Sequence, residues 1–238
     1  MSLDIIETLR GGLRDTLSSK GLKFMGLAYM ISIISKVSSQ SILSKLELQS
    51  GLMNPGPMMS SLAVDGPLPL WTGLGLIGSL AGLWLTIGVL RNFVGENSES
   101  IDTDLFTENL GLPFLNLIIG GLVFGLIVGV GFMLLVIPGI FLLVSLLFWT
   151  VYVSVEDENF IDAMKKSWNM AKGNRFDILL IGAGTLVIGL AAGIVAGIPG
   201  ALVGTISNPL GALVGMTANA FSTVFTLAIL ARAYRQLR

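Results

Sequence analysis

The sequence predicts an all-α integral membrane protein. Its six transmembrane helices form three hairpins, each preceded by a cytoplasmic interfacial amphipathic helix. Composition is the first reason: 53% of residues are hydrophobic and 12% are charged, whereas soluble domains carry roughly 25% charged residues. The second is residues 114–155, a run of 42 residues without a charged side chain. One crossing needs about 20 apolar residues, so this run, with Pro138-Gly139 near its middle, predicts two membrane helices.

Six apolar runs are candidates for the crossings. The first is the weakest because it contains Lys36 and several serines, and a tilted, partly buried or re-entrant segment is the alternative there. The runs span about 24–43, 70–90, 114–136, 140–155, 176–197 and 210–231.

Basic residues predict the orientation, because Lys and Arg concentrate in short cytoplasmic segments. With both termini inside, only Lys36 and Lys45 fall on the outer side. We therefore expect a multi-pass protein of the cell (plasma) membrane with cytoplasmic N- and C-termini. The basic residues on the cytoplasmic side are Arg10, Arg14, Lys20, Lys23, Arg91, Lys165, Lys166, Lys172, Arg175, Arg232, Arg235 and Arg238.

Three segments predict helices lying along the inner membrane surface. In 159–172 the apolar residues recur at helical spacing opposite polar ones. Asn159 with Asp162 resembles a capping box, and Gly173 is a typical C-terminal stop. The second segment, near the N-terminus, has apolar residues opposite Glu7, Arg10 and Arg14, and the third is an acidic stretch at 101–110. The apolar sides comprise Phe160, Ile161, Met164, Trp168 and Ala171; Leu3, Ile6, Leu9, Leu13 and Leu17; and Leu105, Phe106 and Leu110.

These segments also indicate an internal repeat inside one polytopic domain, 1–238. Each is followed by Gly-x-x-Phe, beginning at Gly21, Gly111 and Gly173, and the last two copies place Ile-Pro-Gly at matching distances, at 137–139 and 198–200. The repeats would span 1–100, 101–157 and 158–238. Coincidence in a glycine-rich chain is the alternative.

Composition excludes several chemistries. The chain has no histidine and no cysteine, which removes the commonest general base, the usual zinc and haem ligand, and the thiolate nucleophile. A net charge of −1 makes nucleic acid an unexpected partner. No phosphate-binding loop or dinucleotide motif is present. We therefore expect no cofactor, no catalytic residue and no metal site. The acidic stretch Glu96, Glu99, Asp102, Asp104 and Glu108 suits magnesium or calcium in composition, but a solvated loop is the preferred interpretation.

Two glycine ridges permit close helix packing, at Gly121, Gly125 and Gly129 and at Gly189, Gly193 and Gly197. Packing within one subunit is the preferred interpretation, and a homo-oligomer interface is the alternative.

Two further groups of side chains are candidate sites. Lys165, Lys166, Lys172 and Arg175, beside Trp168, could bind anionic lipid, although topology determination explains the same cations. In the last run, Asn219, Ser222, Thr223 and Thr226 fall near one helix face. Interhelical hydrogen bonding is the preferred role for this polar stripe, and a polar path is the alternative.

One segment carries a resemblance to a known group. The residues are Ile137-Pro138-Gly139-Ile140, Val155-Glu156-Asp157, Ala163, Lys166-Ser167-Trp168 and Lys172-Gly173-Asn174-Arg175. They resemble a signature of prokaryotic membrane proteins that include the YciC-type proteins and the membrane domain attached to some glycerophosphodiester phosphodiesterases. The resemblance implies a six-helix fold and a membrane location, and it carries over no catalytic residue. From the residues themselves, we expect Glu156 near the start of an interfacial helix, favourable to its dipole, and Ser167 on the membrane side bonding neighbouring backbone.

The function expected from these observations is that of a non-enzymatic, lipid-associated membrane scaffold that self-assembles through its glycine ridges in envelope organisation. Its partners would be membrane lipids and other copies of the chain. A small transporter or channel that uses the polar stripe is the main alternative, and a lipid-modifying enzyme that uses the acidic loop is the least favoured.

Overall fold

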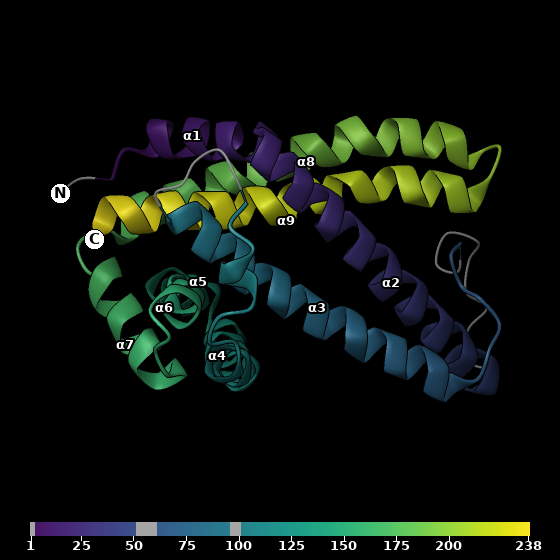
Figure 1. The fold of residues 1–238 in the computed structure, drawn as a ribbon, viewed down its shortest axis with the longest axis horizontal. Helices are drawn as coiled ribbons and strands as arrows, with labels where there is room; N and C mark the ends of the chain where they lie inside the picture. The colour runs from purple at the N-terminus through teal and green to yellow at the C-terminus, as the bar shows by residue number, and fades with distance from the viewer. Residues whose placement is uncertain (1–2, 51–60, 96–100) are drawn as a thin grey trace. The chain divides into compact units, whose positions relative to one another are not determined.

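The computed structural model describes residues 3–50, 61–95 and 101–238, which form helices and their connections with no strand among them (Figure 1). The all-α prediction is therefore confirmed. In chain order the elements are α1 (Ile5–Leu17), α2 (Ser19–Ser50), α3 (Leu68–Val94), the 3₁₀ helix η1 (Asp104–Phe106), α4 (Gly111–Leu134), α5 (Val136–Ser145), α6 (Trp149–Val155), α7 (Phe160–Ala171), α8 (Arg175–Gly204) and α9 (Asn208–Leu237).

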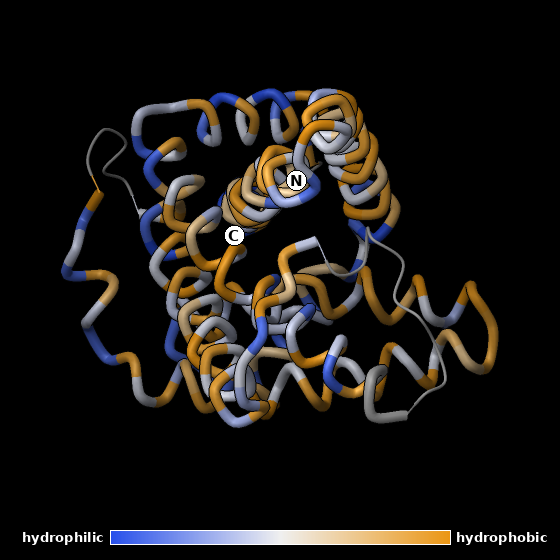
Figure 2. The backbone as a smooth tube through the Cα atoms, turned by 90° about the vertical axis from the view of Figure 1, so that its right-hand side faces the viewer, coloured by the Kyte–Doolittle hydropathy of each residue, from blue (hydrophilic) through white to orange (hydrophobic). Residues whose placement is uncertain are grey.

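Five helical segments among the described residues are long and apolar enough to cross a bilayer. They correspond to the second to sixth predicted runs. Figure 2 shows hydrophobic residues along much of the backbone. The first predicted run lies in α2, a helix of 32 residues that does not reach the same apolarity. The chain therefore has the features of a multi-pass membrane protein with five candidate spans. These are Leu68–Val94, Gly111–Leu134, Val136–Val155, Arg175–Gly204 and Asn208–Leu237.

The chain reverses between α4 and α5 slightly earlier than the sequence suggests. Leu135 is extended, with φ −163° and ψ 152°, and α5 begins at Val136. Pro138 lies in the first turn of α5, where a missing N–H leaves no helix hydrogen bond unmade. The prediction of a break at Pro138-Gly139 is wrong by about three residues. The second Ile-Pro-Gly motif differs again, because Pro199 lies inside α8.

The predicted helix at 101–110 is also wrong, since this segment forms only the single turn η1. Arg91 binds the carbonyl oxygens of Leu105 and Glu108, with N–O distances of 3.3 and 2.5 Å, and the indole N–H of Trp84 donates to the carbonyl of Phe106 at 2.9 Å. These carbonyls are occupied by side chains of α3. They are therefore not available for a regular helix.

The other two predicted segments do form helices. Asn159 caps α7 by accepting hydrogen bonds from the amides of Ile161 and Asp162, at 3.1 and 3.0 Å. Gly173 follows with φ +94°, a conformation that favours glycine. The membrane-surface location of α1 and α7 remains a prediction.

Two compact units can be distinguished by their internal contacts. Unit 1 comprises residues 1–22, 83–187 and 225–238. Its core includes the fully buried side chains of Leu90, Phe148, Val153 and Phe225. Here α1 packs with the side that carries Thr8, Gly12 and Thr16, and it leaves Ile6 and Leu17 exposed.

Unit 2 comprises residues 23–82 and 188–224. Within it α8 and α9 run side by side (Figure 1), and a Cβ at Gly211 would lie 2.4 Å from the carbonyl oxygen of Gly200. The hydroxyl of Tyr29 on α2 donates to the carbonyl of Leu213 on α9 at 3.0 Å. This division by contacts differs from the predicted repeat boundaries, which stay a prediction.

Candidate functional site

The resemblance signature gathers in unit 1, around the junctions between α5, α6 and α7. Ser167 is fully buried: its hydroxyl donates to the carbonyl of Ser145 at 3.1 Å and accepts from the amide of Phe148 at 3.0 Å. It therefore bridges the interruption between α5 and α6. The expected bonding to neighbouring backbone is confirmed, but Ser167 lies inside the protein and not on a membrane-facing side.

Glu156 connects three helices. It follows the last residue of α6, accepts a hydrogen bond from the Lys166 ammonium of α7 at 2.9 Å and another from the Tyr234 hydroxyl of α9, and lies 4.0 Å from Arg238. Lys166 also contacts Glu158 at 2.5 Å. The start of α7 is capped by Asn159 and carries Asp162 in its first turn. The contacts of Glu156 are therefore ion pairs and a hydrogen bond from Tyr234, and its interaction with the dipole of α7 stays a prediction.

These contacts shift the pKa of both partners. Burial alone would raise the pKa of Glu156, but hydrogen bonds from Tyr234 and Lys166 outweigh it, and the net result is a lowered pKa. Hydrogen bonds to Glu158 and Glu156 raise the pKa of Lys166. Both groups are therefore held in their charged forms at neutral pH.

The lowered pKa of Glu156 predicts acid sensitivity. The stability that Glu156 contributes is fully present above its ordinary pKa of 4.5 and is lost as the pH falls through the lower folded-state value. We expect Glu156→Gln to reduce the free energy of unfolding by about 1.5–3 kcal/mol at pH 7, the range for hydrogen bonds to charged groups, and by much less at pH 3. Thermal unfolding in detergent at both pH values measures this difference. Equal destabilisation at both pH values would contradict this role of Glu156. Glu7→Gln, which changes an exposed glutamate, is the control.

The four predicted lipid-contacting cations lie in different environments. Lys165 pairs with Asp162 at 3.0 Å, Lys166 is bound to the two glutamates, and Lys172 is exposed. Arg175 is held most firmly. Its guanidinium lies 4.7 Å from the ring centre of Phe141 and 5.0 Å from that of Trp168, and its Nε donates to the Ser145 hydroxyl at 2.8 Å.

The remaining signature residues have packing roles. Gly139 lies against α4, where a Cβ would come 2.4 Å from the ring of Phe132. Ala163 is fully buried on α7. Asn174 begins the turn into α8, where its carbonyl accepts from the amide of Ile178 at 3.0 Å. Its neighbour Gly173 has the left-handed conformation described above. The structure thus brings the signature together as a structural junction.

Sequence reasoning missed the most heavily bonded cation. Arg91 is only 9% exposed and donates to the carbonyls of Ser154, Leu105 and Glu108 and to the Asp157 carboxylate at 2.7 Å. It lines a hollow of about 270 Å³ with Asn109, Asp157 and others. The sequence signal for Arg91 is its place between an apolar run and an acidic loop. From the sequence, Arg91 contributes only to the predicted membrane orientation.

Most glycines of the predicted ridges face open space. A Cβ at Gly121, Gly125 or Gly129 would meet nothing within 4 Å, and the same holds for Gly193 and Gly197, while Gly189 faces Ser222 at 3.5 Å. Glycines outside the ridges are crowded, among them Gly120 and Gly131 on α4, Gly200 on α8 and Gly211 on α9. The described residues therefore show no close packing at the ridge of α4, and packing within one subunit stays a prediction there.

The polar stripe of α9 also faces outward. Asn219, Thr223 and Thr226 are exposed and Ser222 is half-buried. The Thr223 hydroxyl donates to the backbone carbonyl of Asn219 at 2.8 Å, within its own helix.

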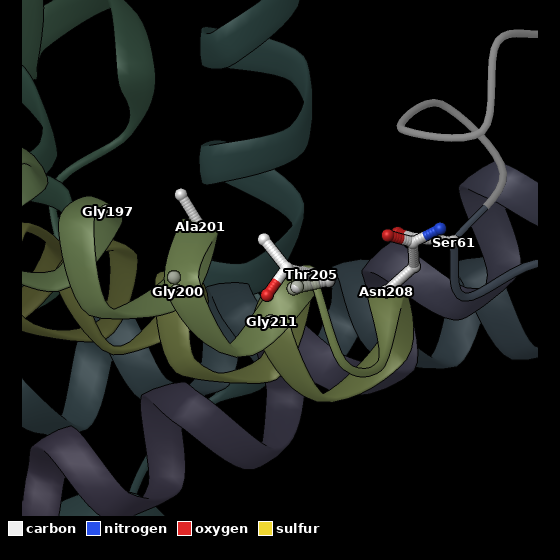
Figure 3. Close-up of a pocket in the computed structure, with 10 residues that line it drawn as sticks. Ser61, Gly197, Gly200, Ala201, Thr205, Asn208 and Gly211 are labelled. Carbon is white, nitrogen blue, oxygen red and sulfur yellow. The ribbon is translucent and has the colours of Figure 1, made fainter.

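A hollow in unit 2 lies along α8 and α9 and has a volume of about 530 Å³. Figure 3 shows Gly197 toward one end and Asn208 with Ser61 toward the other. Small residues and glycines form most of its wall, and Thr205 and Asn208 contribute polar groups. No described side chain in it is a typical general acid or base.

The acidic loop does not assemble a metal site in the part of the chain that the structure describes, where no cluster of three carboxylates could hold a cation. Asp102 instead accepts from the amide of Asp104 at 3.0 Å, and its backbone is bound to the Asn92 side chain. Glu96 and Glu99 lie outside the described residues.

Comparison with known proteins gives one match. Residues 3–237 match the family model described as a domain of unknown function, DUF7847. No curated protein and no solved structure matches. Nothing in these comparisons supports the YciC-like group specifically. Because the match covers nearly the whole chain, the protein belongs to the DUF7847 family, whose function is not known.

Proposed function

We propose that this chain is a non-enzymatic membrane scaffold of the cell envelope, which binds lipid at one membrane face and assembles with copies of itself. In this proposal α2 also crosses the membrane, which gives six crossings together with the five candidate spans. The membrane is the plasma membrane, and both termini are cytoplasmic. The resemblance to the YciC-type proteins would then reflect a shared membrane fold without a catalytic domain.

The glycine ridge of α4 carries the proposal. Gly125 and Gly129 are exposed, and the neighbouring Leu122 and Leu126 are 68% and 69% exposed. Only 22% of the most apolar 18-residue stretch of α4 is buried inside the protein. In a bilayer, helices associate through close backbone approach at small residues, because lipid tails already satisfy apolar side chains. An open ridge on an exposed helix therefore suits contact with another copy.

Features beside α7 support the lipid contact. Arg175 is immobilised between Phe141 and Trp168, Lys172 is exposed, and the neighbouring Phe176 is 71% exposed. An apolar side chain next to one fixed and one exposed cation suits the boundary between acyl chains and anionic headgroups.

Native mass spectrometry from lipid nanodiscs tests the assembly. We expect the wild-type chain to be released as an oligomer with retained lipid, and Gly125→Leu to reduce the oligomer because the added side chain holds two ridges apart. Gly73→Leu is the matched control, since a Cβ at Gly73 also meets nothing within 4 Å but lies on α3, away from both ridges. A strictly monomeric wild type without lipid would contradict the proposal. Equal effects of both variants would contradict the role of the ridge.

A further inference from the structure

We propose that a hollow between α1 and α9 in unit 1 binds a phosphate ester that carries an ammonium group, with Arg10 and Arg14 as the main donors to the phosphate. The hollow has a volume of about 500 Å³, and Arg232 of α9 completes its basic wall. We call it the α1–α9 hollow. This inference goes beyond the proposed scaffold, because it needs no contact between copies and concerns a different site from the cations beside α7.

Arg232 is built into the wall of the α1–α9 hollow. Its Nε and Nη2 donate to the two carboxylate oxygens of Asp15, at 2.6 and 2.8 Å, and its side chain is 22% exposed. The guanidinium lies directly on the backbone of α1 at Gly11, where any Cβ would overlap Nη1 and Cζ. Nη1 has no hydrogen-bond partner among the residues that the structure describes. One edge of the guanidinium is therefore fixed, and its remaining nitrogen is still available as a donor.

Arg10 and Arg14 lie one helical turn apart on α1, and both are exposed. Neither side chain has an ion-pair or hydrogen-bond partner in the described part of the chain, although Glu7 lies only three positions before Arg10. Arg232 adds another guanidinium to the same hollow. Like charges at this spacing on a helix repel each other. An anion in the hollow would therefore stabilise them.

A phosphate suits these donors better than a carboxylate does. A guanidinium presents paired N–H groups that match phosphate oxygens bidentately, and a phosphate has more acceptor oxygens than a carboxylate to share among several arginines. Water occupies about 30 Å³ per molecule, so the hollow has room for roughly 16 groups of that size, far more than inorganic phosphate fills. The space therefore indicates a phosphate ester with a substituent.

Two carboxylates in the wall of the hollow indicate what the substituent carries. Asp4 is engaged, because it accepts a hydrogen bond from the amide of Glu7 at 2.9 Å and so caps α1. The Glu7 carboxylate has no hydrogen-bond or ion-pair partner among the described residues. It would repel a purely anionic ligand, whereas an ammonium on the ester would pair with it. Phosphoethanolamine has this combination of charges.

Apolar side chains on the same side of α1 favour a lipid as the source of the phosphoethanolamine group. Ile6 lines the hollow and is 65% exposed, and Leu17 is 54% exposed. Ile6 precedes Arg10 by four positions and Leu17 follows Arg14 by three, so the four residues share one side of the helix. Cations between exposed apolar residues suit a headgroup whose acyl chains enter the membrane beside α1.

Native mass spectrometry from nanodiscs with equal amounts of phosphatidylethanolamine and phosphatidylglycerol tests the site. We expect the wild type to retain phosphatidylethanolamine, and Arg10→Gln/Arg14→Gln to weaken its retention roughly 30-fold, about fivefold for each cation. Lys23→Gln/Arg235→Gln is the matched control, since it removes two exposed cations that do not line the hollow. Unfolding temperature in detergent checks that both double variants are folded. Equal retention of this lipid by the two double variants would overturn the proposal.

Titration of the protein in detergent with soluble phosphoethanolamine separates the two sources of this group. Saturable binding that Arg10→Gln/Arg14→Gln abolishes, together with no preference among the nanodisc lipids, would assign the hollow to a soluble phosphate ester. Binding in neither experiment would overturn the proposal.

Glu7→Gln tests the contact with the ammonium. It should reduce the preference for phosphatidylethanolamine over phosphatidylglycerol by up to about fivefold, the upper range for an exposed ion pair. An unchanged preference would overturn the role of Glu7. A wild type that is released as a monomer, but loses phosphatidylethanolamine in Arg10→Gln/Arg14→Gln, would reject the proposed self-assembly while supporting this site.

Discussion

Arg91→Met is expected to reduce the free energy of unfolding by about 1–3 kcal/mol, the usual cost of leaving buried hydrogen-bond acceptors without their donor. The methionine keeps the apolar stem but leaves the carbonyls of Ser154, Leu105 and Glu108 and the carboxylate of Asp157 without their donor. Thermal or denaturant unfolding in detergent measures the loss. Hydrogen exchange of residues 101–110 should rise in parallel, because Arg91 anchors this segment.

Two companion variants make the Arg91 result specific. Arg235→Met removes an exposed arginine near the end of α9 and should change stability by less than about 0.5 kcal/mol. Arg91→Lys should be intermediate, because an ammonium keeps the charge but cannot reproduce the planar fork of donors. Similar stability of Arg91→Met and Arg235→Met would show that the network does not hold the loop.

Gly211→Ala is expected to destabilise the chain by about 1–3 kcal/mol, the range for overpacking. The new methyl would lie 2.4 Å from the carbonyl oxygen of Gly200 and 2.6 Å from the Cα of Gly204. Both are backbone atoms, so a side-chain rotation cannot relieve the contact and α8 must move from α9. Unfolding temperature in detergent is the measurement.

The opposite sign is expected at Gly193. A Cβ there meets nothing within 4 Å, and alanine is favoured over glycine in a helix interior by about 1 kcal/mol. Gly193→Ala should therefore be neutral or stabilising. If Gly211→Ala behaves in the same way, the close crossing of α8 and α9 is not present in solution.

Local signals in the sequence predicted the ends of α7 well. Asn159 and Gly173 act through bonds and backbone conformations within a few residues, so the sequence alone contains what is needed. The apolar runs likewise predicted the positions of five candidate spans, since membrane crossing depends on length and hydropathy.

Features that depend on distant partners were not predictable in this way. Arg91 reaches Asp157, 66 positions away, and the same guanidinium binds the carbonyls of Leu105 and Glu108, which an amphipathic pattern at 101–110 would assign to a helix. The spacing of glycines shows only that a close approach is permitted. It does not show which helix makes the approach, and so the ridge of α4 is open while Gly200 and Gly211 are crowded. The same tripeptide, Ile-Pro-Gly, lies in the first turn of α5 at 137–139 and inside α8 at 198–200.

The attachment of α1 to α9 has a consequence for biosynthesis. Asp15 binds Arg232 through both carboxylate oxygens, at 2.6 and 2.8 Å, and the backbone amide of Asp4 donates to Gln236 at 3.1 Å. These contacts join positions 217 and 232 residues apart. During synthesis α1 must therefore wait until its partners on α9, more than 200 residues later in the chain, have been translated. Until then, Asp15 and the backbone amide of Asp4 lack the partners on α9 that hold α1 in unit 1, so this part of the unit can form only after α9 has been made.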